Sequence, residues 1–292
     1  MKRRSFIAHA AAVGSSVGAP VLTGHLRASE PAEAGTPTTS PARIIDTNVY
    51  LGAHPFRESI TAKPQAFALK LADRKVSEAW AGSFEALLQR DITGVNERLT
   101  RDCRAAGGIL KPVGSIHPKL PDWRGDLARC AEQHGMKAIR LHPNYHGYAL
   151  DDPAFVELLE AAAAKKLLVQ IAAQMEDERT QHPLVQVKPV DLKPLAAVLK
   201  KLPEARVMVL NANRVMSMTA LAGTKVWLDI AMLEGVGGVE NLLKDWPQNR
   251  VVFGSFAPFF YFESARLKLQ ESELTAAQLA AITAGNASSL AG

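Results

Sequence analysis

Histidines and carboxylates gather in a few short stretches of this 292-residue sequence. One stretch contains Arg140, His142 and His146. Arg140 and His142 share a face if the stretch begins as a strand, because side chains alternate along a strand. A histidine moves protons near neutral pH and an arginine holds carboxylates, so this pattern favours acid–base chemistry on an anionic substrate. A structural ion pair of Arg140 with Asp46 or Asp229 explains the same residues without catalysis.

A second cluster lies between residues 174 and 183. It contains Glu176, Asp177, Arg179 and His182. Glu176 or Asp177 could form an acid–base pair with His182, and Arg179 could bind substrate. A solvated loop of mixed charge is the alternative interpretation.

Asp229 is the third candidate. It shares a strand face with Trp227 and Ala231 and is expected to point inward, as a general base or as the partner of Arg140. An aromatic run from Phe256 to Glu263 follows later, in which we expect Phe259 and Phe260 to pack. The catalytic candidates are His142, His146, Glu176, Asp177, His182 and Asp229. The substrate-binding candidates are Asn48, Tyr50, Arg140, Tyr145, Arg179, Asn211 and Tyr261.

The elements that must position these residues alternate between short β-branched runs and helical stretches. The expected strands are Arg43–Leu51, Val76–Ser83, Ile109–Ile116, Lys137–His142, Leu168–Gln174, Arg206–Asn211, Lys225–Ala231 and Arg250–Ser255. Clear helical stretches are Pro153–Lys166, Asp191–Leu202, Gly238–Trp246 and Thr275–Ala284. Eight such units over about 250 residues predict an α/β fold, a single-domain (β/α)8 TIM barrel, with the polar residues at the carboxyl ends of the strands. A doubly wound open sheet is the alternative, but no glycine-rich phosphate motif follows the first strand.

The first 42 residues differ in composition from this barrel. Residues 1–28 have a basic start that includes Arg3 and Arg4, an apolar stretch and then polar residues, which predicts a twin-arginine-type export signal and a periplasmic or extracellular location. Residues 29–42 are rich in Pro, Thr and Ala and predict a disordered linker before a barrel over 43–292.

The net charge of +5 depends largely on that signal. Four of the 34 Lys and Arg residues and none of the 29 Asp and Glu residues lie in residues 1–28, so the remainder carries +1. No basic patch interleaved with aromatics is left for nucleic acid. A small molecule is the expected partner, no stable membrane span is expected after signal removal, and the sequence leaves homo-oligomerisation open.

The only two cysteines, Cys103 and Cys130, exclude a disulfide-built scaffold and a cysteine-rich zinc module. Both lie in expected outer helices and have no adjacent histidine. We expect buried apolar residues, and the sequence leaves open whether they pair.

Three short motifs resemble the amidohydrolase-related superfamily. The start Ile45–Gly52 is similar to its I-D-x-H-x-H-x-G opening, and Phe253–Pro258 is similar to its G-S/T-D-x-P motif on strand eight. Asn286-Ala287 resembles the dipeptide that ends many of these barrels. The resemblance implies a TIM barrel, in the branch that contains metal-dependent decarboxylases and lactonases.

The departures from this family concern its metal ligands. The family's metal-binding positions correspond to Asn48, Tyr50, Ala172, Asn211 and Phe256. These side chains offer no imidazole or carboxylate, so we expect no bound metal or other cofactor. The hypothesis that follows is an exported hydrolase that acts, without metal, on a small carboxylated or sugar-derived ester, lactone or amide. The alternative is an inactive barrel that binds a small molecule.

Overall fold

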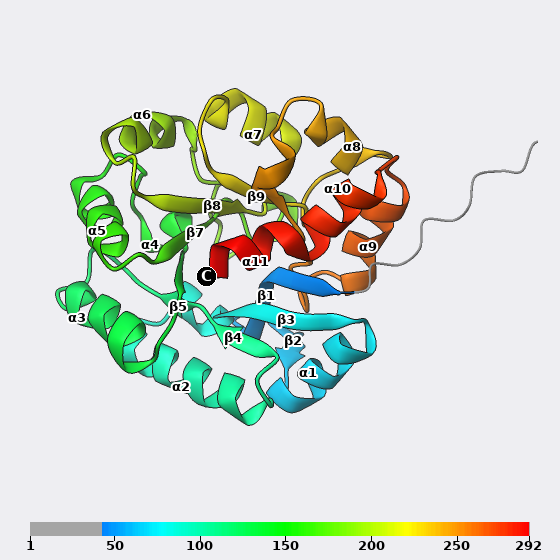
Figure 1. Ribbon diagram of the computed structural model, residues 1–292. Coiled ribbons are helices and arrows are strands. Elements are labelled where there is room, and N and C mark those ends of the chain that lie inside the picture. The colour runs from blue at the N-terminus through cyan, green and yellow to red at the C-terminus, as the bar shows by residue number, and fades with distance from the viewer. Residues whose placement is uncertain (1–42, 292) are drawn as a thin grey trace, which may run out of the picture. The chain divides into compact units, whose positions relative to one another are not determined.

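Strands and helices alternate along the chain in the computed structural model, which describes residues 43–291 (Figure 1). The strands are β1 (Ile44–His54), β2 (Arg57–Ala62), β3 (Val76–Ser83), β4 (Leu110–Pro112), β5 (Gly114–Ser115), β6 (Ala138–Leu141), β7 (Leu168–Ala172), β8 (Arg206–Leu210), β9 (Trp227–Asp229) and β10 (Val251–Val252). The α-helices are α1 (Pro64–Asp73), α2 (Ile92–Ala105), α3 (Trp123–Ala128), α4 (Pro143–His146), α5 (Pro153–Ala164), α6 (Lys193–Lys201), α7 (Arg214–Leu221), α8 (Gly238–Leu243), α9 (Phe262–Gln270), α10 (Ala276–Ala280) and α11 (Asn286–Ala291). Short 3-10 or π segments are η1 (Phe84–Leu87), η2 (Arg129–Gln133), η3 (Glu178–Thr180), η4 (Gln248–Arg250) and η5 (Ala281–Gly285).

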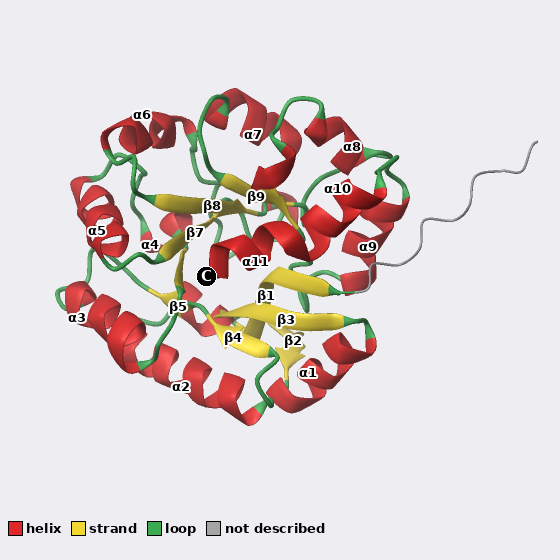
Figure 2. Cartoon of the chain, in the orientation of Figure 1, coloured by secondary structure: helices red, strands yellow, loops and turns green. Residues whose placement is uncertain are grey.

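The strands form a ring surrounded by helices, which confirms the predicted (β/α)8 barrel (Figure 2). One parallel run is β1-β3-β4 and the other is β5 to β10 in chain order. Val113, between β4 and β5, donates its N–H to the Ala81 carbonyl at 2.8 Å, so these two strands continue one another. β1 also contacts the residue that follows β10, because Thr47 donates its N–H to the Phe253 carbonyl at 2.9 Å. A doubly wound sheet has no such contact.

Local sequence explains where the helices begin and end. Asp152 accepts the N–H of Ala154 before α5, and proline follows it at the first helical position. Thr275 and Gln278 form a reciprocal capping box at the start of α10. The last predicted helix continues from α10 into η5, and the other predicted helices are found within two or three residues of the expected bounds.

The amino-terminal end of the barrel is closed by apolar packing. Ile45, Trp80 and Leu168 form a cluster with Ala287 and Leu290 of α11, which crosses that opening (Figure 1). The polar strand ends are therefore directed to the opposite, carboxyl-terminal face, where barrel enzymes carry their sites.

The structure differs from the predicted strand pattern in two places: it has an additional strand, β2, and it divides one expected strand in two. β2 forms an antiparallel hairpin with the end of β1, outside the repeating units. The strand expected over 109–116 is divided into β4 and β5. Cys103 and Cys130 are buried as expected, and both are free, which the sequence had left open. Burial raises the pKa of each to about 12. Within residues 43–291 no helix is long and apolar enough to span a membrane. The predicted signal and linker lie outside the described residues.

Candidate functional site

A network of amides and one carboxylate lies on the barrel axis. The Asn48 amide nitrogen on β1 donates to Asn211 Oδ1 at 2.8 Å and to Asp229 Oδ2 at 2.7 Å. Asp229 Oδ1 also accepts the Asn211 backbone N–H at 2.9 Å. All three residues are buried. The predicted candidates Asn48, Asn211 and Asp229 therefore come together, but they bind one another.

A second buried carboxylate lies beside this network. Asp46 accepts the Ser255 hydroxyl at 2.5 Å and its N–H at 3.0 Å. Burial raises the pKa of Asp46 to about 7 and that of Asp229 to about 6, against the opposing effect of their hydrogen bonds. Both carboxyl groups thus take up protons near neutral pH.

Arg140 on β6 is completely buried and binds neutral acceptors. Its guanidinium donates to Gln170 Oε1 at 2.8 Å and to the backbone carbonyls of Val49, Thr47 and Trp80 at 2.9–3.2 Å. None of the ion pairs among residues 43–291 includes Arg140, so the expected pairing with Asp46 or Asp229 is wrong. The predicted substrate-binding role stays a prediction; the side chain has no exposure, and each of its three nitrogens donates to a group of the protein. Backbone carbonyls of β1 and β3, which are not hydrogen-bonded neighbours of β6, take the place of the carboxylate as its partners.

His142 and His146 lie together, one at each end of α4, with ring centroids 5.9 Å apart. His142 Nε2 is 3.0 Å from the Tyr50 hydroxyl, and His146 Nε2 donates to the Ala86 carbonyl at 2.9 Å. Burial lowers the pKa of His142 well below its usual value and that of His146 to about 4. Both rings are therefore neutral at pH 7, and their described contacts include neither Asp229 nor Glu176.

Aromatic side chains fill the mouth of the barrel above this network. Tyr50 stacks on Phe84 at 4.6 Å and meets the edge of Phe256 at 5.6 Å. Phe259 stacks on Phe256 at 4.9 Å and Phe260 meets it at 5.4 Å, so both pack as expected. Tyr50 is fully buried, and Tyr145 lies partly buried against the same cluster. Their predicted substrate-binding roles stay predictions.

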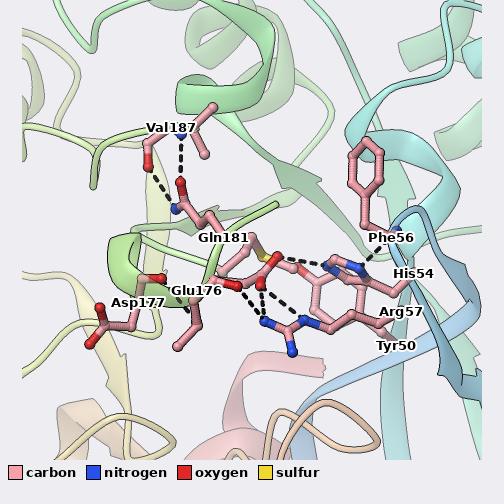
Figure 3. Close-up of polar contacts among 10 residues, drawn as sticks. Tyr50, His54, Phe56, Arg57, Glu176, Asp177, Gln181 and Val187 are labelled. Atoms are coloured by element: carbon pink, nitrogen blue, oxygen red, sulfur yellow. Dashed lines mark hydrogen bonds and ion pairs between the residues drawn. The ribbon is translucent and has the colours of Figure 1, made fainter. Parts of the chain in front are cut away.

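Glu176 joins two loops at the rim (Figure 3). Its Oε2 accepts from Arg57 Nε at 3.0 Å, and its Oε1 lies 3.3 Å from His54 Nε2. Burial opposes its charge, but these two partners hold the pKa of Glu176 below its usual value. Glu176 is therefore paired with Arg57 and His54 and not with His182. His54 and Arg57 were not predicted from the sequence, because they come from the unexpected β1–β2 hairpin.

The other candidates from this loop are dispersed. Asp177 pairs with Arg179 two residues later at 2.6 Å, and this contact lowers the pKa of Asp177 to about 2. His182 is exposed and stacks on Phe56 at 4.4 Å. Tyr261 is 85% exposed. The predicted acid–base pair of Glu176 or Asp177 with His182 is therefore wrong, since each side chain has a nearer partner.

A groove of about 450 Å³ lies at this face, beside the packed mouth. We call it the rim groove; it is lined by Gln174, Asp177, Glu178, Pro189, Asn213, Ala231, Met232, Leu233, Glu234, Phe260 and Lys268. Lys268 donates to the Ala231 carbonyl at 2.9 Å, and burial lowers its pKa. The polar groups that line the rim groove are two amides, three carboxylates and the Lys268 amine.

The residues at the family's metal positions do not fit a divalent metal. Asn48 presents amide hydrogens to its neighbours, the Tyr50 hydroxyl is bonded to His142, and Phe256 is buried and apolar. No three His, Cys, Asp or Glu side chains of the described residues form a group that could hold a metal ion. A zinc or manganese site needs several imidazole or carboxylate ligands.

Comparison with known proteins supports the family assignment from the motifs. A family model described as amidohydrolase matches residues 58–290. The chain belongs to the amidohydrolase family. A search of curated proteins finds no match to this amidohydrolase sequence.

Solved structures share the fold of this amidohydrolase at low sequence identity. A manganese-bound 5-carboxyvanillate decarboxylase from Novosphingobium aromaticivorans is 12% identical, with TM-score 0.67 and 87% and 98% of the two chains covered. A 2,6-dihydroxybenzoate decarboxylase from Rhizobium is 10% identical, with TM-score 0.67 and coverage of 87% and 99%. A manganese-bound dihydroxybenzoic acid decarboxylase from Polaromonas is 10% identical, with TM-score 0.68 and coverage of 85% and 96%. At such identities the likeness establishes the fold alone.

Proposed function

We propose that this amidohydrolase-family protein binds a small neutral, polyhydroxylated molecule in the rim groove, without the metal chemistry of the family. The observation that carries the absence of metal chemistry is the Asn48 amide, which donates to both Asn211 and Asp229. These hydrogens satisfy two facing acceptors without a cation between them. A metal would have to displace this amide and would gain a single carboxylate in return.

The separation of the acid–base candidates also supports binding over catalysis. His142 contacts Tyr50, Glu176 contacts Arg57 and His54, and Asp229 contacts the two asparagines. A general acid and base must reach the same reacting atoms within hydrogen-bond distance. These three groups have different partners, and His142 and Asp229 are sealed from solvent.

The chemistry of the groove favours a neutral ligand over a carboxylate. Arg179 neutralises Asp177, and Lys268 is tethered to a backbone carbonyl, so Glu178 and Glu234 leave the lining slightly acidic. Amide and carboxylate groups accept hydrogen bonds from hydroxyls, while the Phe260 ring offers an apolar surface. Sugars and sugar lactones match this lining, and aromatic acids do not.

Ligand-induced thermal stabilisation tests this proposal. We expect neutral sugars or sugar lactones to raise Tm in a concentration-dependent way, and matched sugar acids to have a smaller effect. The Glu178→Ala/Glu234→Ala variant should lose the shift, whereas Glu204→Ala, at an exposed site away from the groove, should keep it. Equal shifts in wild type and the double variant would contradict a site in the rim groove.

A metal-independent hydrolase is the second candidate, and one observation favours it. Burial raises the pKa of Asp229 to about 6, in the range of a general base that works near neutral pH. We expect no turnover of an ester, lactone and amide panel above the solvent rate. Turnover lost in Asp229→Asn or His142→Ala would instead establish this second function.

We also propose export of the folded protein, supported by the basic start and the apolar stretch of residues 1–28. Fractionation of cells that express the full chain should place it outside the cytoplasm. An Arg3→Lys/Arg4→Lys variant should be retained inside, and an unchanged distribution would contradict twin-arginine export.

A further inference from the structure

A second hollow lies at the opposite end of the barrel from the rim groove. It opens between β3, β4 and the β6–β7 pair, next to α11, and has a volume of about 250 Å³. We call it the basal pocket; it is lined by Glu78, Trp80, Lys111, Pro112, Val113, His134, Gly135, Met136, Lys137, Ala138, Leu168 and Leu290. It therefore shares no residue with the rim groove.

The floor of the basal pocket is apolar and continuous with the barrel core. Trp80, Val113, Met136, Leu168 and Leu290 are each at most 5% exposed. The Trp80 indole N–H already donates to Glu78 Oε1 at 2.7 Å, so it requires no partner from a ligand. An apolar ligand that enters this pocket therefore leaves water for a site lined by apolar side chains, and the gain comes mainly from its own surface.

The rim of the basal pocket is basic. Lys111 and Lys137 are exposed, His134 is half-buried, and none of these three side chains has a hydrogen bond or ion pair with another described residue. Other lysines of this chain do have partners, since Lys165 contacts Glu132 and Lys119 contacts Asp152. Two lysines without a described partner, beside an apolar hollow, complement a molecule with one anionic group and an apolar body.

We propose that the basal pocket binds a small amphiphilic carboxylate, whose apolar body lies over Trp80 and Leu168 and whose carboxylate lies between Lys111 and Lys137. A body of about eight carbons suits a pocket smaller than those that hold drug-sized ligands. The α11 helix supplies Leu290, and Arg206 donates to the Leu290 carbonyl at 2.6 Å, so the wall on this side is held to the barrel.

Calorimetric titration of the full chain with octanoate tests the proposal, with 1-octanol and octylammonium as the neutral and cationic counterparts. We expect octanoate to bind at least about tenfold more tightly than octylammonium, and Lys111→Gln/Lys137→Gln to weaken octanoate at least about tenfold, because two partly screened charges are lost. Octanoate should also change the tryptophan fluorescence, and Trp80→Phe should reduce that change.

A matched control is available on the same molecule. Lys200 and Lys225 border a hollow of about 280 Å³ between α6 and the loop that follows α7, so Lys200→Gln/Lys225→Gln removes the same charge beside a similar volume. We expect this variant to bind octanoate like wild type. No octanoate binding, equal affinity for octylammonium, or equal weakening by both double variants would overturn the proposal.

Discussion

The barrel axis and the barrel rim both carry polar side chains, but these side chains differ in their hydrogen-bond partners and in their exposure. On the axis, Asn48, Asp229 and Arg140 are buried and bonded to amides and backbone carbonyls. At the rim, Glu176 is bonded to Arg57, whose side chain is 34% exposed. The axis thus contributes mainly to stability, while the rim retains groups that a ligand can reach.

Removal of one arginine from the axis and one from the rim should give the largest difference in the free energy of unfolding. Arg140→Met leaves several buried carbonyls without a donor, and we expect a loss of about 3–5 kcal/mol in the free energy of unfolding. Arg57 is partly exposed and its loss leaves the buried Glu176 with His54, so Arg57→Met should lose less, about 1–2 kcal/mol. Urea unfolding of both variants measures the difference, and equal losses would remove the distinction between axis and rim.

The next largest effect should be the pH dependence of the stability that the buried Asp46 contributes. Because the folded pKa of Asp46 is raised to about 7, its folded carboxyl holds a proton that the unfolded chain releases near pH 4. Wild-type stability relative to Asp46→Asn should therefore fall as pH rises from about 4 to 7, by roughly 4 kcal/mol in total, and then level off. The variant-minus-wild-type difference isolates this effect from the buried histidines, whose lowered pKa values act in the opposite sense. A difference that does not change with pH would contradict a protonated Asp46.

The Asn48 bridge is expected to contribute less than Arg140. Asn48→Leu leaves Asp229 and Asn211 without their shared donor, and we expect a loss of about 1–3 kcal/mol in urea unfolding at pH 7. Asn48→Asp brings two carboxylates together, so its loss should be larger at pH 8 than at pH 5. If Asn48→Leu were neutral, the bridge would not stabilise the axis.

The smallest effects should come from the rim pair. Glu176→Gln should lose about 1 kcal/mol or less at pH 7. Since the pKa of Glu176 is lowered on folding, wild type should have its advantage above about pH 4.5 and lose it as pH falls through the folded pKa. His182→Ala, at an exposed ring stack, should stay within about 0.5 kcal/mol. Losses of several kcal/mol at either site would show that the rim side chains stabilise the fold as much as the axis does.

The sequence was informative about the axis and much less so about the rim. Strand periodicity and strand order bring Asn48, Asn211 and Asp229 to one end of the barrel, and this follows from local patterns alone. Which groups bond to each other depends on neighbouring strands, so the backbone partners of Arg140 were not predictable. The rim contacts depend on the β1–β2 hairpin, for which the sequence has no repeating pattern. Asp177, which was expected to pair with His182, pairs with Arg179 two residues later instead.

Metal content tests the central claim, that an amide network stands where this family binds its metal, most directly. The protein is purified without chelator or histidine tag, incubated with manganese or zinc, dialysed and measured by elemental analysis. We expect less than about a tenth of an equivalent of metal per chain. One equivalent that disappears in Asp229→Asn would contradict this account.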